Sequence, residues 1–230
     1  MSDLKSKIKI VLAIIASSAA GKTTLRRTFT DQDAGADKHS ETIQCYHARQ
    51  RGYIPYKVKW TTFPNGTSLC GHPGTGADSN GNLDAINRAI DKCLAVSDFV
   101  IFDGVMSSKK LVEHLIHHPY QNLVVVWVYL DVSAETVLAR LLARRTKNGE
   151  TETSEKTKRG VLHFRKRAAV TWKYITWNYK REPFALVEIP EGPTPGEIHE
   201  ALKPVIAEMQ TVVIRQNIPL RTWRVTSRAW

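Results

Sequence analysis

A lysine and a threonine follow a glycine near the amino terminus, as Gly21-Lys22-Thr23. The residues before them are small, and residues 16–23 (ASSAAGKT) fit the Walker A pattern of phosphate-binding loops. In such a loop, backbone N–H groups and the lysine bind phosphates, and the threonine hydroxyl binds Mg²⁺. We therefore predict a site for ATP and Mg²⁺, with Lys22 acting in catalysis and Thr23 binding the metal. Its residues are Ala16, Ser17, Ser18, Ala19, Ala20, Gly21, Lys22, Thr23 and Thr24.

The segments around this motif are those that a phosphate-binding loop requires. Residues 7–15 (KIKIVLAII) are almost continuously apolar, which predicts a strand buried on both faces. A helix is expected from Gly21 to about Thr30. Because the loop holds only one glycine, Ala19 and Ala20 must adopt conformations that an alanine can reach.

Two aspartates are candidates for metal binding and proton transfer. Asp103 ends a buried strand predicted at 98–103, where its carboxylate can hold Mg²⁺ or accept the proton of an attacking hydroxyl. The sequence leaves these two roles open, and a helix-capping aspartate is the alternative. Asp78, in the glycine-rich segment 71–81, is the rival general base or else a turn residue. Three other aspartates are expected to be solvated loop residues: Asp31, Asp33 and Asp37.

Arginines gather around a predicted helix–loop–helix. Arg140 and Arg144 lie one turn apart on a helix predicted at 133–145, and a polar segment follows at 146–157. Because mobile arginines commonly stabilise a phosphoryl group in transfer, we assign both to catalysis. The arrangement predicts a basic helical lid at about 140–167, with a solvated basic face as the alternative.

The positive charge of the chain is concentrated in two segments. The formal net charge is +11: residues 140–181 carry +10, residues 211–230 carry +4, and the rest of the chain carries −3. Such segments indicate contact with phosphate, of either a nucleotide or a nucleic acid. We expect DNA as the partner and assign Arg165 and Arg167 to its binding. Interleaved aromatic residues are candidates for base stacking, although those at helical spacing are more often core: Trp172, Tyr174, Trp177, Tyr179, Trp223 and Trp230.

Length and composition fit one α/β domain. The 230 residues hold no apolar run near the roughly 20 that a membrane span needs, so we expect a cytoplasmic protein without a membrane partner. Alternating strands and helices predict a parallel sheet flanked by helices. The domain is placed at 1–210, with an insertion at about 41–81 and a basic tail at 211–230. Three cysteines are expected to be reduced thiols: Cys45, Cys70 and Cys93.

The segment 41–72 is the hardest to interpret. Residues 56–63 alternate in polarity, Pro64-Asn65-Gly66 signals a turn and residues 67–70 return, which predicts a β-hairpin. Residues 31–40 are predicted to be loop. The remaining predicted helices are 83–94, 107–117, 160–179 and 195–209, and the remaining strands are 123–130 and 185–189.

These motifs together resemble the nucleotide-kinase group of P-loop proteins, which contains thymidylate and adenylate kinases. The resemblance rests on residues 16–24, on the strand 98–104 with its carboxylate, and on the basic segment 140–167. It implies a parallel sheet of about five strands, binding of ATP and Mg²⁺, and an acceptor bound above the strand ends.

A finer resemblance concerns the acceptor. Phe102-Asp103-Gly104 stands where thymidylate kinases have an Asp-Arg pair, and with residues 60–66 (WTTFPNG) and 71–84 it looks like bacteriophage-type kinases of 5-hydroxymethyluracil in DNA. This implies a base pocket near the predicted hairpin and glycine loop, with Trp60 and Asp78 binding substrate, in the cytoplasm of a host cell. Two alternatives stay open: a soluble deoxynucleoside or nucleoside monophosphate kinase, and a P-loop ATPase or switch protein that binds nucleic acid. The oligomeric state also stays open.

Overall fold

The computed structural model describes residues 8–104, 108–120, 122–146, 154–178, 184–212 and 222–224. The strands are β1 (Lys9–Ile15), β2 (Asp37–His47), β3 (Gly52–Thr62), β4 (Thr67–Cys70), β5 (Phe99–Gly104), β6 (Leu123–Asp131), β7 (Phe184–Pro190) and β8 (Thr222–Arg224). The α-helices are α1 (Lys22–Arg27), α2 (Leu83–Val96), α3 (Lys109–Ile116), α4 (Ala134–Thr146), α5 (Glu155–Asn178) and α6 (Pro195–Val212). Two 3₁₀ turns are η1 (Asp31–Asp33) and η2 (Ala77–Asn80).

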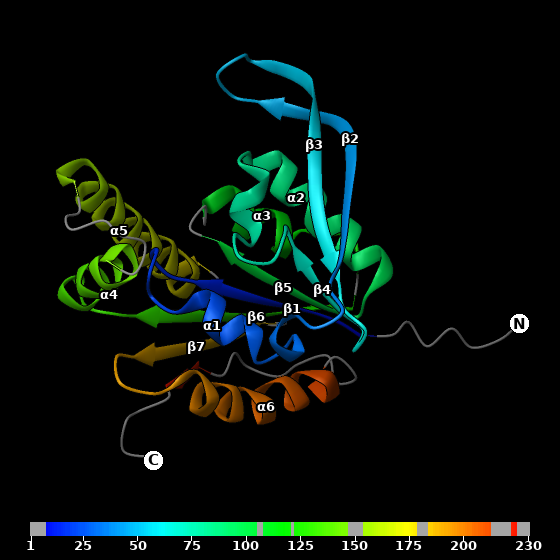
Figure 1. Cartoon of the computed structure of the whole chain (residues 1–230). Coiled ribbons are helices and arrows are strands. Elements are labelled where there is room, and N and C mark those ends of the chain that lie inside the picture. Colours follow the sequence, from blue (N-terminus) through cyan, green and yellow to red (C-terminus); the bar gives the residue numbers. More distant parts are fainter. Residues whose placement is uncertain are drawn as a thin grey trace, which may run out of the picture.

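One mixed sheet runs through the molecule in the order β2-β3-β4-β5-β1-β6-β7-β8 (Figure 1). Neighbours from β4 to β8 pair in parallel, whereas β2–β3 and β3–β4 are antiparallel. The predicted α/β fold is confirmed, but two details of the prediction are wrong. The sheet is mixed rather than parallel, because β2 and β3 join its edge in antiparallel pairs, and the described residues form eight strands instead of about five. One of the additional strands, β8, lies in the predicted tail and pairs with β7.

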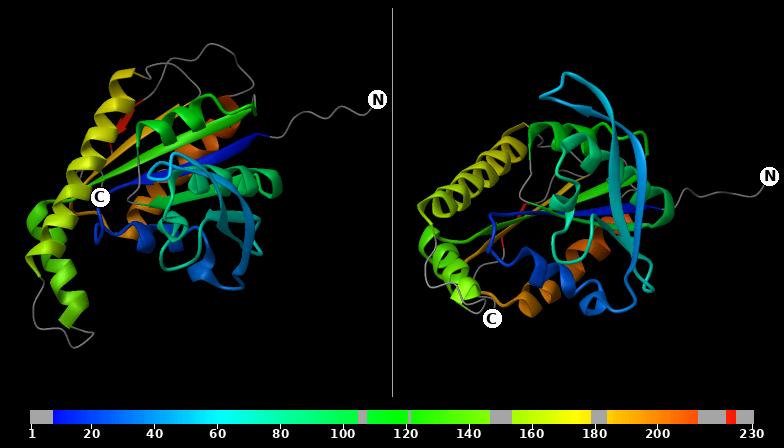
Figure 2. Two further views of the ribbon diagram at one scale, coloured as in Figure 1. Left: turned by 90° about the horizontal axis from the view of Figure 1, so that it is seen from above. Right: turned by 45° about the horizontal axis from the view of Figure 1, so that its top comes forward.

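Helices cover both faces of the sheet (Figure 2). On one face α2, α3 and α5 bury residues such as Ile86, Leu111 and Trp172. On the other face α1 and α6 bury Leu25 and Leu202. The central strand β1 is buried on both faces, as its apolar sequence predicts.

Side-chain caps fix where two of the helices begin. The Asn82 side chain accepts a hydrogen bond from the backbone N–H of Asp84 (2.8 Å) at the start of α2. Ser133 accepts one from the N–H of Thr136 (3.1 Å) before α4, so the helix start predicted there is confirmed. The first helix, α1, is shorter than predicted, and α5 begins five residues earlier than the predicted residue 160.

The β2–β3 hairpin is the largest departure from the predicted elements. Residues 37–40, predicted to be loop, belong to β2, which pairs with β3 from Asp37↔Thr62 to His47↔Gly52. The predicted hairpin exists in addition, as the antiparallel pair β3–β4. Figure 1 shows β2 and β3 projecting beyond the helices on one side of the sheet. Most side chains of β2 stay at least partly exposed, which explains why its burial pattern is weak in the sequence.

The three cysteines Cys45, Cys70 and Cys93 are free and buried, as predicted. Within the described ranges, no helix combines the length and the apolar character needed to cross a membrane. Two predicted segments fall largely outside the description: most of the polar loop at 146–157, and most of the tail at 211–230.

Candidate functional site

A cavity of about 510 Å³ opens where the parallel strands end. Its wall is formed by residues 18–25 after β1, by Asp103 at the end of β5, and by residues 189–193 at the end of β7 and after it. In parallel sheets the carboxyl ends of the strands form the usual place for ligands. The volume lies within the roughly 300–1,000 Å³ of small-molecule sites.

The loop between β1 and α1 has a strained backbone at the cavity wall. Ala19 and Gly21 have φ angles of 60° and 102°, in the left-handed region. Gly21 adopts this conformation readily, whereas it costs Ala19 about 1–2 kcal/mol. Among the described residues, no side chain caps the first turn of α1. Strain of this kind concentrates at functional sites.

The side chain of Lys22 folds back onto this loop. Its Nζ donates hydrogen bonds to the carbonyl oxygens of Ser17 (2.5 Å) and Ala16 (3.2 Å). Lys22 is only 8% exposed, and this burial lowers the pKa of its ammonium to about 8, against the raising effect of Asp78 and Asp103. Lys22 is therefore a cation at neutral pH that is held at the wall of the cavity.

Asp103 is buried beside Arg26, and no role was predicted for this arginine from the sequence. Arg26 Nε donates to Asp103 Oδ2 (3.1 Å), and Arg26 Nη2 donates to Asp33 Oδ2 (2.9 Å). Arg26 is fully buried, so these carboxylates compensate its charge. The prediction that Asp33 is solvated is wrong. Although burial alone would raise it, the hydrogen bonds and charge of Arg26 bring the pKa of Asp33 down to about 2.

The other carboxylate oxygen, Asp103 Oδ1, is buried and has no hydrogen-bond partner among the described residues. Burial raises the pKa of Asp103 to about 6, although Arg26 and Lys22 act against the rise. A buried carboxylate oxygen without a donor is costly, and this one lies against Gly76 in a residue that lines the cavity. Carboxylate and hydroxyl oxygens suit Mg²⁺, and the Thr23 side chain lines the same cavity. Asp103 and Thr23 thus fit the predicted metal.

The glycine loop, residues 71–81, packs directly on the end of β5. A Cβ atom on Gly76 would overlap with Asp103 Oδ1 and with the Asp103 carbonyl oxygen, so only glycine fits there. The same packing brings Asp78 close to Gly104, the residue after Asp103: a Cβ atom added to Gly104 would lie 3.1 Å from Asp78 Oδ1. Asp78 also lines the cavity, and its charge acts on Lys22 and Asp103. The two rival aspartates are therefore neighbours in one site.

Arg140 and Arg144 line the cavity from α4. Both are exposed at its mouth, and Arg140 Nη1 donates to the carbonyl oxygen of Ala20 (3.4 Å), which follows β1. The structure thus brings both predicted catalytic arginines to the predicted phosphate-binding loop.

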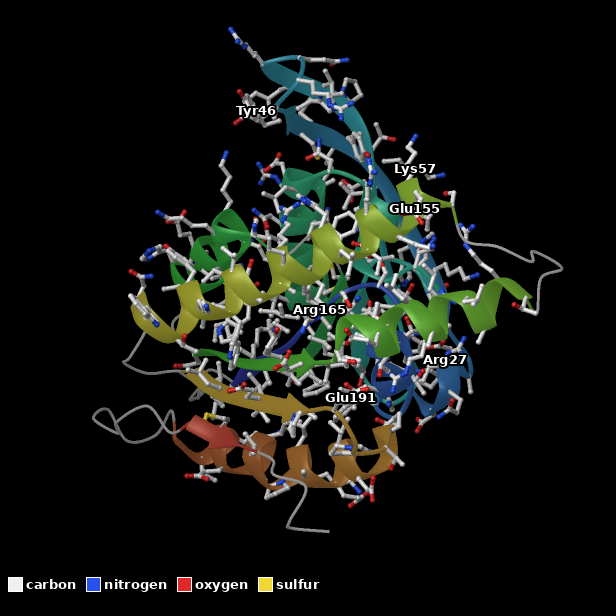
Figure 3. The ribbon with its side chains drawn as sticks, turned by 90° about the vertical axis from the view of Figure 1, so that its left-hand side faces the viewer. Arg27, Tyr46, Lys57, Glu155, Arg165 and Glu191 are labelled. Atoms are coloured by element: carbon white, nitrogen blue, oxygen red, sulfur yellow. The ribbon has the colours of Figure 1, made fainter. Side chains whose placement is uncertain are left out.

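The other two predicted arginines, Arg165 and Arg167 on α5, do not line the cavity. Arg165 Nε donates to the Val132 carbonyl oxygen (2.8 Å), and Arg165 also forms an ion pair with Asp131 (3.7 Å). Figure 3 shows Arg165 below α5, beside the start of α4. Arg165 therefore holds α5 against the end of β6.

The aromatic residues predicted to contact the substrate are scattered. Trp60 lies on β3 outside the cavity wall and stacks on His39, with ring centroids 5.3 Å apart. Trp172 is 7% exposed and stacks on Tyr129 in the core, so the core interpretation holds for it. Trp177 is 79% exposed. Tyr179, Trp230 and the side chain of Trp223 lie outside the described residues.

A separate cluster could hold a metal ion at the other end of the sheet. Asp91 Oδ1 accepts hydrogen bonds from Nε2 of His114 (2.9 Å) and of His118 (3.1 Å). His118 Nδ1 accepts from the N–H of Tyr120 (3.3 Å), which leaves its Nε2 protonated for Asp91. Lys9 Nζ lies 5.4 Å from the Tyr120 ring, which places the cluster near the start of β1. The three side chains satisfy one another and join α2 to α3, away from the cavity.

Three features at the cavity were not predicted from the sequence: Arg26 and Gly76, which both contact the cavity-lining Asp103, and residues 189–193, which line the wall. Arg26 follows Lys22 by four residues, so helical spacing places both on one face of α1. Gly76 stood among four glycines, and nothing in the sequence says which one touches Asp103. The segment after β7 carries no ionisable pattern beyond Glu191.

Comparison with known proteins gives no family assignment, because no protein-family model and no curated protein matches this chain. The geometry of the cavity therefore carries the functional interpretation.

Proposed function

We propose that this chain is an ATP-dependent phosphotransferase that binds MgATP in the carboxyl-edge cavity and transfers the γ-phosphoryl group to a hydroxyl. One observation supports it above all: the unpartnered buried oxygen of Asp103 shares a cavity with a strained loop and the buried ammonium of Lys22. A cation on one wall and an unsatisfied carboxylate on another suit a metal-bound polyphosphate.

The loop and Lys22 bind the phosphates in this proposal. Backbone N–H groups of residues 18–23 donate to phosphate oxygens, and Lys22 exchanges its hydrogen bonds to Ala16 and Ser17 for stronger, charge-assisted ones. Thr23 and Asp103 would hold Mg²⁺, which would neutralise charge on the phosphates when bound. Arg26 holds Asp103 through Oδ2, and Oδ1, which has no hydrogen-bond partner among the described residues, would be the oxygen left for the metal.

Proton transfer falls to Asp78. Asp103 is engaged by Arg26, whereas Asp78 is only half-buried and lines the cavity from the glycine loop. Asp78 accepts the proton of the attacking hydroxyl as its oxygen bonds to the γ-phosphorus, while the bond from that phosphorus to the β,γ-bridging oxygen breaks and ADP leaves. Arg140 and Arg144 stabilise the negative charge of the phosphoryl group during transfer.

For the acceptor we propose a hydroxymethylated pyrimidine in DNA, such as 5-hydroxymethyluracil. The support is the +10 charge of residues 140–181, which exceeds what a mononucleotide requires. Exposed side chains on α5, among them Lys166, Lys173 and Trp177, supply charge and an aromatic face beside the cavity-lining α4. A soluble nucleoside monophosphate kinase is the second candidate, because 510 Å³ is a volume typical of small-molecule sites.

The test is transfer of labelled phosphate from [γ-³²P]ATP to three acceptors offered separately: DNA with 5-hydroxymethyluracil, ordinary DNA and free mononucleotides. We expect label on the modified DNA alone. Label on mononucleotides alone contradicts DNA as the acceptor and favours the second candidate, a nucleoside monophosphate kinase. Release of free phosphate without any labelled acceptor contradicts phosphotransfer and indicates an ATPase or switch protein.

A further inference from the structure

A second cavity, of about 470 Å³, lies between the tip of the β2–β3 hairpin and the start of α2. Residues 46–49 form one wall, residues 81–84 with Asn87 form the other, and Lys110 of α3 completes the lining. The glycine loop separates it from the first cavity, because Asp78 lines the first and Gly81 lines the second. The short turn η2 thus contributes Asp78 to the first cavity, and the glycine that follows it lines the second.

Two buried polar atoms in residues of this wall have no hydrogen-bond partner in the described part of the chain: His47 Nδ1 and Asn87 Oδ1. They come from different elements, the end of β2 and the second turn of α2. Such atoms are rare in folded proteins, since each costs about 1–3 kcal/mol when left unsatisfied. Because both residues line one cavity, it suits a ligand with hydrogen-bonding groups at its edge.

The rim of this cavity is aromatic and basic. Tyr46 and Tyr53 are 40% and 67% exposed, and their rings meet edge to face at 5.7 Å. Figure 3 shows Tyr46 near the tip of the hairpin, well above Glu191 in this view. Residues 42–60 contain four Lys or Arg and no acidic residue, and one of these, Arg49, lines the cavity. Exposed aromatic rings with cations are the features that bind nucleic-acid strands.

The wall is held in place before any ligand arrives. The N–H of Tyr46 donates to Asp84 Oδ2 (2.8 Å), and Asn82 Nδ2 donates to the Tyr46 carbonyl oxygen (3.2 Å). These bonds fix the hairpin tip on α2. The Asp84 carboxylate in the wall disfavours a bound phosphate, whereas a neutral base with polar edges is compatible with it.

We propose that the second cavity receives a nucleobase of the DNA substrate, next to the base that is phosphorylated in the first. Asn87 and His47 hydrogen-bond the edge of this base, Tyr46 contacts its face, and Arg49 contacts the adjoining backbone phosphate. The proposal rests on the proposed function for the class of its ligand, and it deepens that function by adding a site that positions the strand.

The test is DNA binding in the absence of ATP. Binding is measured by the fluorescence anisotropy of a labelled oligonucleotide that contains one 5-hydroxymethyluracil. Asn87→Ala and Arg49→Ala should each weaken binding roughly tenfold. The matched control is Arg88→Ala, an exposed arginine of α2 that does not line the cavity, and it should bind as the wild type does. Asn87→Ala should not lower the unfolding temperature, since it removes an oxygen that has no partner.

Two outcomes overturn the second site. One is unchanged binding by both Asn87→Ala and Arg49→Ala; the other is an equal loss in Arg88→Ala, which would indicate binding by charge alone. The proposed phosphotransfer is tested separately, by the transfer of label from ATP in the wild type. If the wild type transfers no label but binding still depends on Asn87, the second site stands and the phosphotransferase proposal fails.

Discussion

Charged side chains are buried and paired at the carboxyl edge of the sheet, whereas they are exposed and basic at the tip of the β2–β3 hairpin. At the edge, Arg26 and Asp103 are buried and paired, and a glycine backbone packs against the carboxylate. At the hairpin, Arg49 and Arg51 are exposed in a segment without acidic residues. A buried, paired arrangement has one geometry and suits a small ligand held in one pose. An exposed basic one tolerates variation and suits an extended polyanion.

The strictest test of this contrast is Gly76→Ala. The added Cβ atom would overlap with the Asp103 carboxylate and backbone. We therefore expect the unfolding free energy to fall by about 3–5 kcal/mol and phosphotransfer to be lost. Gly74→Ala is the matched control, since Gly74 also has a positive φ but open space around its Cα. It should cost only about 1–2 kcal/mol. Equal effects of the two substitutions in urea denaturation would show that the edge is not tightly packed.

Asp103→Asn should lower the rate of phosphotransfer about 100-fold or more, because the amide keeps the shape but loses the charge that faces the metal. Asp131→Asn is the control: Asp131 also ends a strand, but it pairs with Arg165 outside the cavity. Initial rates at saturating ATP compare the two. Wild-type turnover in Asp103→Asn would remove this carboxylate from the mechanism.

The affinity for MgATP should fall about tenfold between pH 7 and pH 9. Burial places the pKa of Lys22 near 8 in the free protein, so the ammonium is mostly protonated at pH 7 and mostly neutral at pH 9. The phosphates of ATP bind the protonated form of Lys22, so the affinity for MgATP falls as the pH rises above about 8. Lys22→Arg stays charged throughout and should show a flat profile in equilibrium titrations; a flat wild-type profile would contradict the assignment.

The smallest effect is expected at the hairpin, for Tyr53→Ala. This exposed side chain should contribute less than about 0.5 kcal/mol to folding, while DNA affinity falls roughly threefold. Tyr120→Ala is the control, because Tyr120 is also exposed but stacks on His118 at the other end of the sheet. Thermal unfolding and anisotropy separate the two quantities. A drop in stability without a drop in affinity would make Tyr53 purely structural.

The elements that position the cavity could be predicted from the sequence because their signals are local. A continuous apolar run predicted β1, and the order of glycine, lysine and threonine predicted the loop that follows. Strand ends predicted that Asp103 would lie at the same edge as this loop, and helical spacing predicted that Arg140 and Arg144 would share a face.

What could not be predicted depends on contacts between distant segments. Asp33 looked like a solvated turn residue, because its partner Arg26 becomes visible only when α1 is folded against β5. The strand β2 was missed because its mostly exposed side chains show no alternation of buried and exposed positions. The second cavity joins residues 46–49 to residues 81–87, and no periodicity in either segment reports that they meet.

The central claim is that the loop at residues 16–24 holds MgATP, and isothermal titration calorimetry tests it most directly. The wild type should bind one MgATP per chain, whereas Lys22→Ala should bind at least tenfold more weakly with an unchanged unfolding temperature. Lys203→Ala, an exposed lysine of α6, serves as control and should bind normally. Absence of binding heat in the wild type across temperatures, or wild-type affinity in Lys22→Ala, would contradict the claim.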